Sequence, residues 1–365
     1  MTLPEHKKKW YLFPFAFLYG VAVSIRNRLF DYNIIKSKEF DIPIICIGNI
    51  SAGGTGKTPH VEYLVKYLSK EFNPVVLSRG YKRKTKGFLK ADISSTVDDI
   101  GDESKQIKQK FPEIEVVVDE KRVHAVEKLL EDDKNSEINA IILDDAFQHR
   151  KIKPGINILL IDYNRPITKD FLLPVGNLRE RSWRKKRAHI IIVTKTPADM
   201  KPIERRIMEK ELNLFPYQSL FFTKIVYGKP RDIFTHKEKD ISLVNANVLL
   251  ITGIAFSNPL VEYLKSYTND IVHLKYPDHY KYKTKDIDLI QKEYQKLNEE
   301  NKVIITTEKD AVRLIEMKDF EKFKKIPFFY IPIEVQFFDE EKEKYFQKII
   351  YNYVKNNKRH NKLYI

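Results

Sequence analysis

The sequence predicts an α/β fold with a mostly parallel sheet flanked by helices, followed by a second, smaller α/β lobe. Short apolar runs alternate with helical or polar stretches, and one run ends at a glycine-rich turn before a helical pattern. This alternation fades after Asp199 and resumes at "NVLLITGIA", residues 247–255. We therefore expect residues 31–220 to form the first lobe and residues 221–365 the second, with the boundary near residues 215–230.

Each short apolar run is expected to be a buried strand, because turn or polar residues bound it. The runs of the first lobe are "IPIICIGNI", "PVVLSRG", "EVVVDE", "INAIILDD", "INILLID" and "AHIIIVTK". A helix should follow the first run, since apolar residues recur at spacings of three and four at Val61, Leu64, Val65 and Leu68. "ERRIMEKELN" predicts a charged helix and "SLFFTKIVYG" an extended crossing segment, whereas the Lys/Asn-rich tail after Asn352 should be solvated or frayed.

Composition indicates a folded protein of two domains. The chain has 365 residues, of which 42% are hydrophobic and 12% aromatic, and this content excludes a disordered chain. Its single cysteine, Cys46, excludes an intramolecular disulfide and a cysteine-based zinc site. A reducing compartment fits best.

The formal charge of +15 favours a polyanionic partner, either nucleic acid, anionic lipid or a phosphorylated substrate. Charge alone does not choose between these, and a lysine-rich solvated surface gives the same balance. We find no aromatic and basic pattern specific for nucleic acid, so we expect no nucleic-acid partner. The sequence says nothing of protein partners.

The stretch "NISAGGTGKTPH", residues 49–60, has the features of a phosphate-binding P-loop. It stands between a predicted strand and a predicted helix, whereas a merely flexible turn would not need that order. Ser51 occupies the place of the first glycine in the common pattern. The expected nucleotide-binding residues are Ser51, Gly53, Gly54, Thr55, Gly56, Lys57 and Thr58, with Lys57 on the β- and γ-phosphates and Thr58 on Mg²⁺. The first lobe is thus predicted to be a P-loop NTPase core.

The nucleotide is expected to be ATP. Guanine recognition uses N/T-K-x-D, but "TKTP" at 194–197 has proline in place of the aspartate, and "TEKD" at 307–310 has the lysine displaced. Ala52 replaces the additional P-loop lysine of the ATPases that sort proteins and metals, which disfavours that class.

Asp144 and Asp145 directly follow an apolar run, as a Walker B element would. A carboxylate at the end of a neighbouring strand holds Mg²⁺ in such sites, although a strand-end aspartate is often only a cap or turn residue. Together with the P-loop, the pair predicts Mg²⁺ binding.

Residues 1–30 are expected to form an amphipathic helix on a membrane surface. Sixteen uncharged residues, Trp10 to Ile25, lie between Lys7–Lys9 and Arg26. A spanning helix needs roughly 20. The run also imitates a secretory signal, but export would separate a nucleotide-binding loop from its nucleotide. The remaining alternative is a buried helix that caps the sheet.

The order of the motifs resembles that of the tetraacyldisaccharide 4′-kinase family. The blocks are "IGNISAGGTGKTPH", "LSRGYKRK", "VDDIGDES", "LDDAFQHR", "FLLPVGNLRE", "ITGIAFSNP", "YPDHYKY" and "TTEKDAVRL", and together they span nearly the whole chain. Ala146 and Ser104 depart from the family pattern, which usually has glycine and proline there. The resemblance implies transfer of the ATP γ-phosphate to the 4′-hydroxyl of an acylated glucosamine disaccharide 1-phosphate. The product is lipid IVA, in lipid A biosynthesis. It also implies a peripheral enzyme at the cytoplasmic face of the inner membrane.

The resemblance assigns roles to individual residues. Asp102 of "GDE" corresponds to the base that accepts the hydroxyl proton, and His279 of "PDHY" to its partner, so the two lobes should close to join them. Without the resemblance Asp102 is equally a helix cap and His279 an ordinary loop residue. Arg179 is expected to face the transferring charge and Glu180 the Mg²⁺, or both to form a surface ion pair. The remaining expected substrate contacts are Arg79, Tyr81, Arg83, Gln148, His149 and Asn177.

Two other functions remain possible from the sequence. A membrane-associated regulatory P-loop ATPase would hydrolyse ATP with no lipid acceptor. A nucleic-acid-binding ATPase would respond to DNA or RNA, with a steep dependence on salt.

Overall fold

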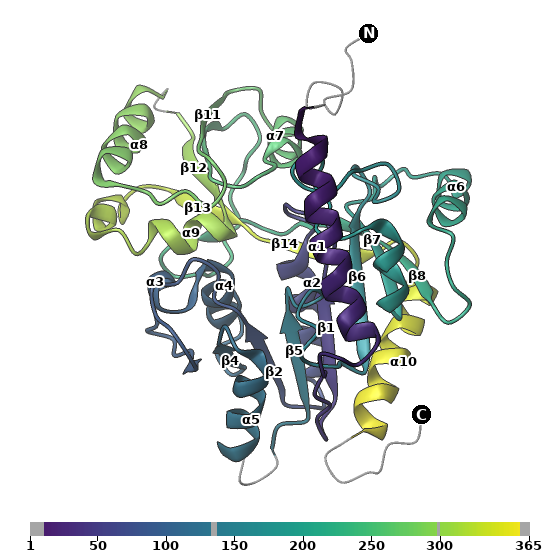
Figure 1. Cartoon of the computed structure of the whole chain (residues 1–365). Coiled ribbons are helices and arrows are strands. Elements are labelled where there is room, and N and C mark those ends of the chain that lie inside the picture. The colour runs from purple at the N-terminus through teal and green to yellow at the C-terminus, as the bar shows by residue number, and fades with distance from the viewer. Residues whose placement is uncertain (1–10, 133–136, 298–299, 358–365) are drawn as a thin grey trace.

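The computed structural model describes residues 11–132, 137–297 and 300–357. Within them the strands form two sheets, one of nine strands and one of five (Figure 1). In spatial order the large sheet contains β14 (Ile333–Phe337), β8 (Ser219–Tyr227), β7 (Ile190–Thr194), β6 (Ile156–Asp162), β1 (Ile44–Gly48), β5 (Ala140–Asp144), β2 (Pro74–Ser78), β4 (Glu115–Val118) and β3 (Leu89–Lys90). The small sheet contains β11 (Ile271–Lys275), β10 (Asn247–Thr252), β12 (Lys302–Thr307), β13 (Phe328–Ile331) and β9 (Arg231–Asp232).

The predicted fold class is confirmed, because neighbouring strands inside both sheets are parallel. Antiparallel pairs occur at the sheet edges, between β14 and β8, β3 and β4, and β13 and β9. The strands β1, β5, β2 and β7 of the large sheet are buried along their whole length. Helices cover both faces of such a strand, so a continuous apolar run is favoured over an alternating one.

Helices pack on both faces of the large sheet. One face is covered by α2 (Lys57–Leu68), α4 (Asp102–Lys110) and α10 (Glu340–Asn356), whose apolar residues share a core with β1, β5 and β6. The other face is covered in part by α5 (Arg122–Asp132). The remaining helices of the first lobe are α3 (Val97–Ile100), α6 (Pro202–Leu212) and the 3-10 helix η2 (Ser182–Arg187).

The small sheet has its own two cores. On one face α8 (Thr284–Lys296), α9 (Glu308–Leu314) and the 3-10 helix η3 (Lys318–Phe323) bury Ile287, Leu314 and Phe320. On the other face α7 (Asn258–Lys265) buries Leu260 and Leu264. The second lobe is therefore a separate α/β layer structure beside the first.

Strand order places the expected site at one edge of the large sheet. The P-loop strand β1 lies between β5 and β6, and Ile47 of β1 is paired with Asp144 of β5. The carboxyl ends of parallel strands meet at one edge, where open α/β sheets bind ligands. The P-loop and the Asp144–Asp145 pair are thus neighbours in space.

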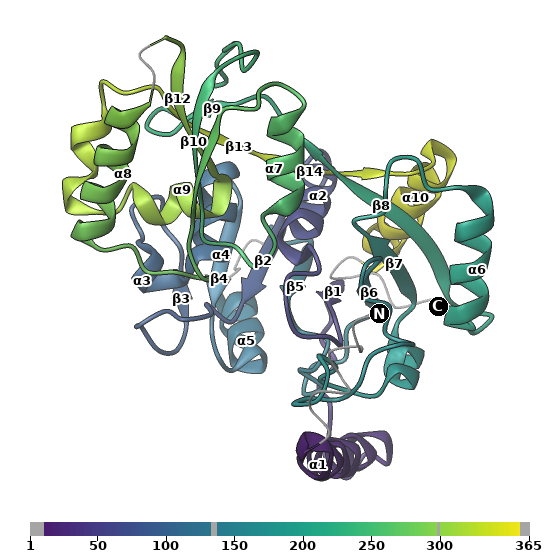
Figure 2. The same cartoon turned by 90° about the horizontal axis from the view of Figure 1, so that it is seen from above.

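The chain returns to the large sheet after the second lobe. β8 leaves the first lobe and β14 comes back beside it, so that the two strands connect the lobes (Figure 2). The helix α10 then buries Val354, and the hydroxyl of Tyr353 accepts a hydrogen bond of 3.0 Å from the Ile44 amide. The expectation of a solvated or frayed tail after Asn352 is wrong as far as Asn356, because apolar and aromatic side chains hold this helix on the sheet. We propose a second lobe of residues 229–331, with residues 332–357 in the first; the predicted division at 221 stays a prediction.

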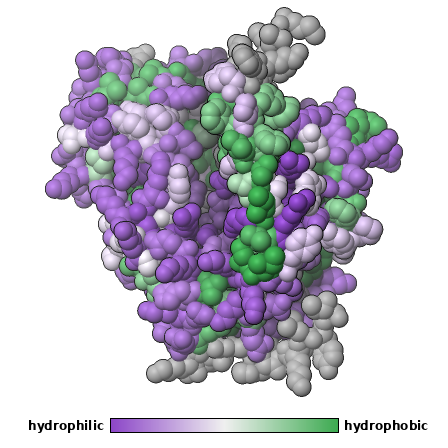
Figure 3. Space-filling model, in the orientation of Figure 1, coloured by the Kyte–Doolittle hydropathy of each residue, from purple (hydrophilic) through white to green (hydrophobic). Residues whose placement is uncertain are grey.

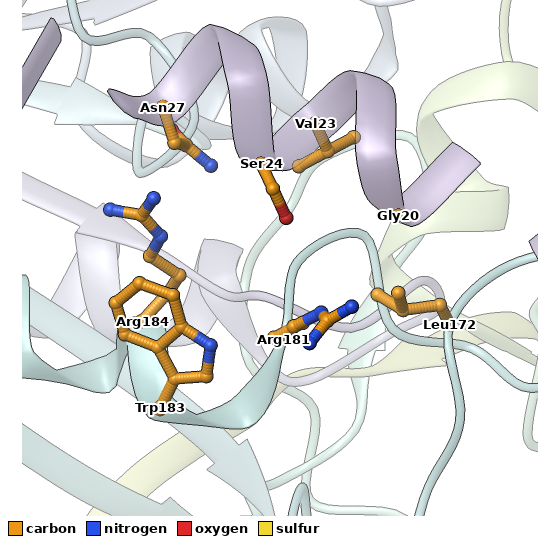
Figure 4. A pocket seen from close by; sticks show the side chains of 8 residues that line it. All are labelled: Gly20, Val23, Ser24, Asn27, Leu172, Arg181, Trp183 and Arg184. Atoms are coloured by element: carbon orange, nitrogen blue, oxygen red, sulfur yellow. The ribbon is translucent and has the colours of Figure 1, made fainter. Parts of the chain in front are cut away.

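The helix α1 (Phe13–Asp31) lies on the surface and packs on the segment 171–184 rather than on the sheet. Figure 4 shows Ser24 and Asn27 facing Arg184 across a small gap. The Arg184 guanidinium binds the Asp31 carboxylate at 2.6 Å, which fixes the end of the helix. The alternative considered from the sequence, a buried helix that caps the sheet, does not fit the structure, because the outer residues of α1 are exposed.

The outer face of α1 is apolar and exposed. Phe15, Phe17 and Leu18 are 61%, 66% and 64% exposed, and the helix forms a hydrophobic stripe on the surface (Figure 3). Such a stripe on a surface helix marks an interaction surface. None of the helices in the described parts of the chain has the length and apolar character that crossing a bilayer requires. Trp10 and Lys7–Lys9 lie outside the described residues.

Candidate active site

A cleft of about 1360 Å³ opens between the two lobes. Its floor is the P-loop and the start of α2, residues 52–59. The second lobe lines it with residues 254–256, His279 and Lys309, and α1 lines it with Tyr19 and Arg26. The cleft therefore extends from the P-loop to the exposed helix α1, and the residues that line it are far apart in the sequence.

The P-loop has a backbone that glycine favours. Gly53 and Gly56 have φ angles of 98° and 84°, in the left-handed region, and α2 begins directly after Gly56. A Cβ atom at Gly53 would lie 2.9 Å from an Arg165 nitrogen, whereas one at Gly54 would meet no atom within 4 Å. The loop thus leaves open space beside Gly54 at the amino end of a helix, which suits an anion.

Backbone contacts at Ser51 and Asn177 hold the P-loop against a neighbouring segment. Ser51 forms a β-bridge with Leu178, and the Ala52 amide donates a 2.7 Å hydrogen bond to the Asn177 carbonyl. Neither Ser51 nor Asn177 lines the cleft. We therefore leave Ser51 and Asn177 out of the proposed nucleotide and substrate contacts and assign them backbone contacts that hold the loop.

Two cations of the first lobe hold Asp145. Lys57 Nζ and Arg179 Nη1 each lie 3.5 Å from Asp145 Oδ2. Asp145 follows β5 with a φ of 46°, a left-handed conformation that turns the chain at the end of the strand. The P-loop lysine and the strand-end carboxylate are thus neighbours, so that one could reach the phosphates and the other the Mg²⁺ of a bound nucleotide.

The acidic pair fits a divalent cation. Asp144 is buried, and one oxygen each of Asp144 and Asp145 has no hydrogen-bond partner among the described residues. Burial, together with the charges of Glu103 and Asp145, raises the pKa of Asp144 to about 7. A bound cation would stabilise the ionised carboxylate of Asp144 and so lower its pKa. The described residues contain no group of three or more His, Cys, Asp or Glu residues that could hold a metal, and Mg²⁺ of this kind takes only one or two carboxylates plus phosphate oxygens.

Glu180, the fourth expected Mg²⁺ contact, is already paired. Its carboxylate accepts hydrogen bonds of 2.9 Å from Arg187 and of 2.9 Å from Asn27 on α1. Glu180 therefore links α1 to the first lobe, and we leave it out of the proposed metal site.

Asp102 and His279 are in contact, as the resemblance implies. His279 Nδ1 lies 2.9 Å from Asp102 Oδ2, with the residues on different lobes. Asp102 is the first residue of α4, and the cap of this helix is Gly101, so Asp102 is not its N-cap. Its other oxygen, Oδ1, accepts a hydrogen bond of 3.0 Å from the Glu103 amide.

Cations from the second lobe surround this pair. Arg313 donates to Asp102 Oδ2, and Lys309 Nζ lies 3.0 Å from Glu103 and 3.3 Å from His279 Nε2. Burial raises the pKa of Asp102, but the hydrogen bond from His279 and the charges of Lys309 and Arg313 outweigh it. The Asp102 pKa therefore stays well below its usual range.

Sequence reasoning missed Lys309, Arg313 and Glu103. All three belong to blocks of the family resemblance, but no role was assigned to them. Arg313 follows Asp310 by three residues, a spacing that places both on one face of a helix. That spacing was the only available signal, and it does not identify Asp102 as the partner.

Several expected substrate contacts line the cleft: Arg79, Tyr81, Gln148, His149 and Arg179. The Tyr81 ring packs edge-on to the His279 ring, with centroids 5.3 Å apart. Burial and the positive charges of Arg122, Lys151, Arg26 and Arg79 lower the pKa of His149 to about 4. His149 Nε2 has no partner among the described residues. These five residues form the basic wall of the cleft, which carries positive charge and a neutral histidine.

Arg83 does not line the cleft. Its guanidinium pairs with Glu120 at 2.9 Å and donates to the Gly87 carbonyl at 2.7 Å. We leave Arg83 out of the proposed substrate contacts, because the side chain fixes a loop of its own lobe.

Known proteins of one family match this chain over nearly its whole length. A family model described as tetraacyldisaccharide-1-P 4′-kinase matches residues 8–354. Tetraacyldisaccharide 4′-kinase of Phocaeicola vulgatus is 47% identical over 96% of both chains. That of Bacteroides thetaiotaomicron is 46% identical over 96% of this chain and 94% of its own. The crystal structure of LpxK from Aquifex aeolicus in complex with ATP superposes with a TM-score of 0.73 at 28% identity, covering 94% of this chain and 98% of that one.

Proposed function

Because the chain belongs to the tetraacyldisaccharide-1-P 4′-kinase family, we propose how its cleft distributes that reaction among its residues. The protein is an ATP-dependent kinase of lipid A biosynthesis, as the motif order predicted. It phosphorylates the 4′-hydroxyl of tetraacyldisaccharide 1-phosphate to give lipid IVA. One observation carries the assignment of residues: a single cleft contains the P-loop and His279, which is hydrogen-bonded to Asp102.

The ATP triphosphate binds the P-loop in this proposal. The amides of residues 53–58 surround the β- and γ-phosphates, and Lys57 moves from Asp145 to the γ-phosphate. Thr58, Asp144 and Asp145 would hold Mg²⁺, which would supply positive charge to the transferring phosphoryl group. The apolar part of the cleft at Tyr227 and Phe256 offers a surface for the adenine ring.

Asp102 and His279 act together as the acceptor of the hydroxyl proton. A sugar hydroxyl is a weak nucleophile, so its proton must leave as the new P–O bond forms. Because the two side chains are hydrogen-bonded, the accepted proton is shared by the pair and belongs to neither residue alone. Both lobes contribute, so closure of the lobes over the phosphates brings the acceptor pair to the reaction and excludes water.

The acceptor sugar lies against the basic wall of the cleft. Arg79 faces its 1-phosphate and Arg179 the transferring phosphoryl group, while Gln148 and the neutral His149 can hydrogen-bond its hydroxyls. Tyr81 offers an apolar ring beside His279 for the sugar face. Support comes from their common place on the cleft and from the unpartnered His149 Nε2.

The enzyme works at the cytoplasmic face of the inner membrane in this proposal. The outer face of α1 dips into the lipid surface, while its inner residues Tyr19 and Arg26 line the cleft. One helix would then contact the bilayer and the lipid acceptor together. The +15 charge favours binding to anionic lipid.

Transfer of label from γ-labelled ATP tests the proposal. The wild type and Lys57→Ala are incubated with tetraacyldisaccharide 1-phosphate in detergent, and the label is followed into lipid and into free phosphate. We expect label in lipid with the wild type only. Label released as free phosphate at the same rate with and without acceptor would instead favour the regulatory ATPase.

A further inference from the structure

Arg313 is anchored on the second lobe before it reaches the first. Its Nη1 donates to Asp310 Oδ1 and to the Gly253 carbonyl, both at 3.1 Å. Asp310 is fully buried and accepts hydrogen bonds of 2.8 Å from the Gly253 amide and 2.7 Å from the Thr307 hydroxyl. The anchor of Arg313 is therefore a saturated buried network with little freedom to move.

The opposite edge of the same guanidinium binds Asp102. Arg313 Nε lies 3.1 Å from Asp102 Oδ2, and Nη2 also donates to this oxygen. The two residues are 211 positions apart and belong to different lobes. Only a planar fork with several donors can serve two carboxylates on opposite edges, and a lysine cannot do so.

His279 is held by the same hydrogen-bond network. Its amide donates a 3.1 Å hydrogen bond to the Gly253 carbonyl, which is also an acceptor for Arg313. A side chain at Gly253 would place its Cβ 2.8 Å from Asp310 Oδ1, so the close packing needs glycine here. One backbone carbonyl thus fixes His279 relative to the arginine that fixes Asp102.

We propose that Arg313 is a positioning residue for phosphoryl transfer, which clamps Asp102 against His279 across the lobe interface. The inference rests on the proposed role of the Asp102–His279 pair. Arg313 does not line the cleft, so it acts through Asp102 rather than on the substrate. The pair is complete only when α9 is docked on α4, which couples proton acceptance to lobe closure.

The charges around the pair predict how its proton binding depends on Arg313. Arg313 Nη2 is 3.3 Å from His279 Nδ1 as well as bonded to Asp102. Loss of this cation favours the protonated pair, whichever member holds the proton. The ionisable groups around the pair are Glu103 from α4, Asp278 beside His279, Tyr81 from the first lobe, and Lys309 and Asp310 from α9.

The test compares Arg313→Gln and Arg313→Lys with the wild type in the full-length enzyme. Glutamine removes the charge and the fork, so we expect kcat to fall about 10- to 100-fold with KM for ATP within about twofold. The acid limb of the kcat profile should move to higher pH. Lysine keeps the charge but not the fork, and should restore part of kcat and most of the acid limb.

Lys281→Gln is the matched control. Lys281 makes an exposed ion pair of 3.0 Å with Asp98 across the same interface and does not contact Asp102. Its kcat and pH profile should stay those of the wild type. An unchanged kcat in Arg313→Gln, or a fall with no shift of the acid limb, would overturn the proposal.

Two further outcomes are informative. If Arg313→Gln does not fold, Arg313→Lys decides, because a loss confined to kcat supports positioning and a loss confined to thermal stability contradicts it. If Asp102→Asn is itself fully active, the proposed role of the pair fails. If Asp102→Asn is inactive and both Arg313 variants are normal, only the present inference fails.

Discussion

His279 Nδ1 lies 2.9 Å from Asp102 Oδ2, although 177 residues separate the two along the chain. The contact joins the amino end of α4 in the first lobe to the loop after β11 in the second. Arg313 and Lys309 complete a cluster in which one buried carboxylate meets three nitrogen-bearing side chains. Asp102 is thus the centre of this cluster at the lobe interface.

Asp102→Asn should reduce stability at neutral pH and change how stability depends on pH. The substitution leaves the buried Arg313 with only one of its two anionic partners, Asp310, at a cost of about 3 kcal/mol. The folded-state pKa of Asp102 lies below the unfolded value of about 3.9, so its contribution is present above pH ~4 and is lost as pH falls further. The difference between wild type and variant should shrink in acid, which denaturant unfolding at several pH values measures. Asp278→Asn, a change at an exposed neighbour of His279, should follow the wild type throughout.

Asp144→Asn should have the opposite effect in the metal-free protein. The folded-state pKa of about 7 lies above the unfolded value, so the carboxyl lowers stability progressively from pH ~4 to pH ~7. Asparagine removes a penalty on the order of 4 kcal/mol at pH 8, and the melting temperature should rise there but hardly change at pH 4. With Mg²⁺ and ATP the order should reverse, because the variant lacks a cation ligand. A variant that is less stable than the wild type at pH 8 without Mg²⁺ would contradict the burial argument.

Two glycines of the P-loop should respond differently to alanine. Gly56 has a φ of 84°, so Gly56→Ala should cost about 1 kcal/mol of stability. Gly54 has open space around an added Cβ, so Gly54→Ala should melt like the wild type. Its methyl group would enter the space we assign to the phosphates and should raise KM for ATP at least severalfold. Equal KM values for Gly54→Ala and the wild type would move the triphosphate away from this part of the loop.

Polar substitution on the outer face of α1 should weaken membrane binding without unfolding the protein. Phe15 and Phe17 are exposed, and each buries apolar area worth about 1–2 kcal/mol if it enters the lipid surface. Phe15→Ser/Phe17→Ser should therefore lower partitioning to phosphatidylglycerol-containing vesicles at least tenfold, with an unchanged melting temperature. Tyr345→Ser, at an exposed aromatic residue of α10, is the control and should partition like the wild type. Equal partitioning of all three proteins would argue against α1 as the contact.

The sequence predicted those parts of the fold that local patterns determine. The strands β1 and β5 are contiguous apolar runs with fixed ends, and α2 follows a P-loop in which Gly53 and Gly56 have the left-handed angles such a turn needs. The return of β14 and α10 to the large sheet was not predictable, because nothing in residues 333–356 indicates which sheet they join. That choice depends on packing between segments about 280 residues apart, as in the hydrogen bond from Tyr63 to Glu343.

The residues of the candidate site also divide into those that local motifs indicate and those that depend on contacts between distant segments. Lys57, Asp144 and Asp145 were expected at the site because a short motif carries their chemistry, and Asp102 and His279 because the family resemblance names both; their roles stay proposals. Arg313 was not, since its role depends on a contact with the other lobe. Glu180 and Asn177 stand in a family block but bind neighbouring protein groups instead, and a motif does not show which partners a side chain has after folding.

The kinetics of Asp102→Asn, His279→Gln and the double variant test the central claim most directly. Single-turnover transfer from γ-labelled ATP to the 4′-hydroxyl is measured at saturating substrate, together with ATP affinity. If the two side chains accept the proton as a unit, each single variant should lose nearly as much rate as the double variant, at least about 100-fold, with ATP affinity unchanged. Rate losses that simply multiply, or transfer at the wild-type rate in Asp102→Asn, would contradict the account.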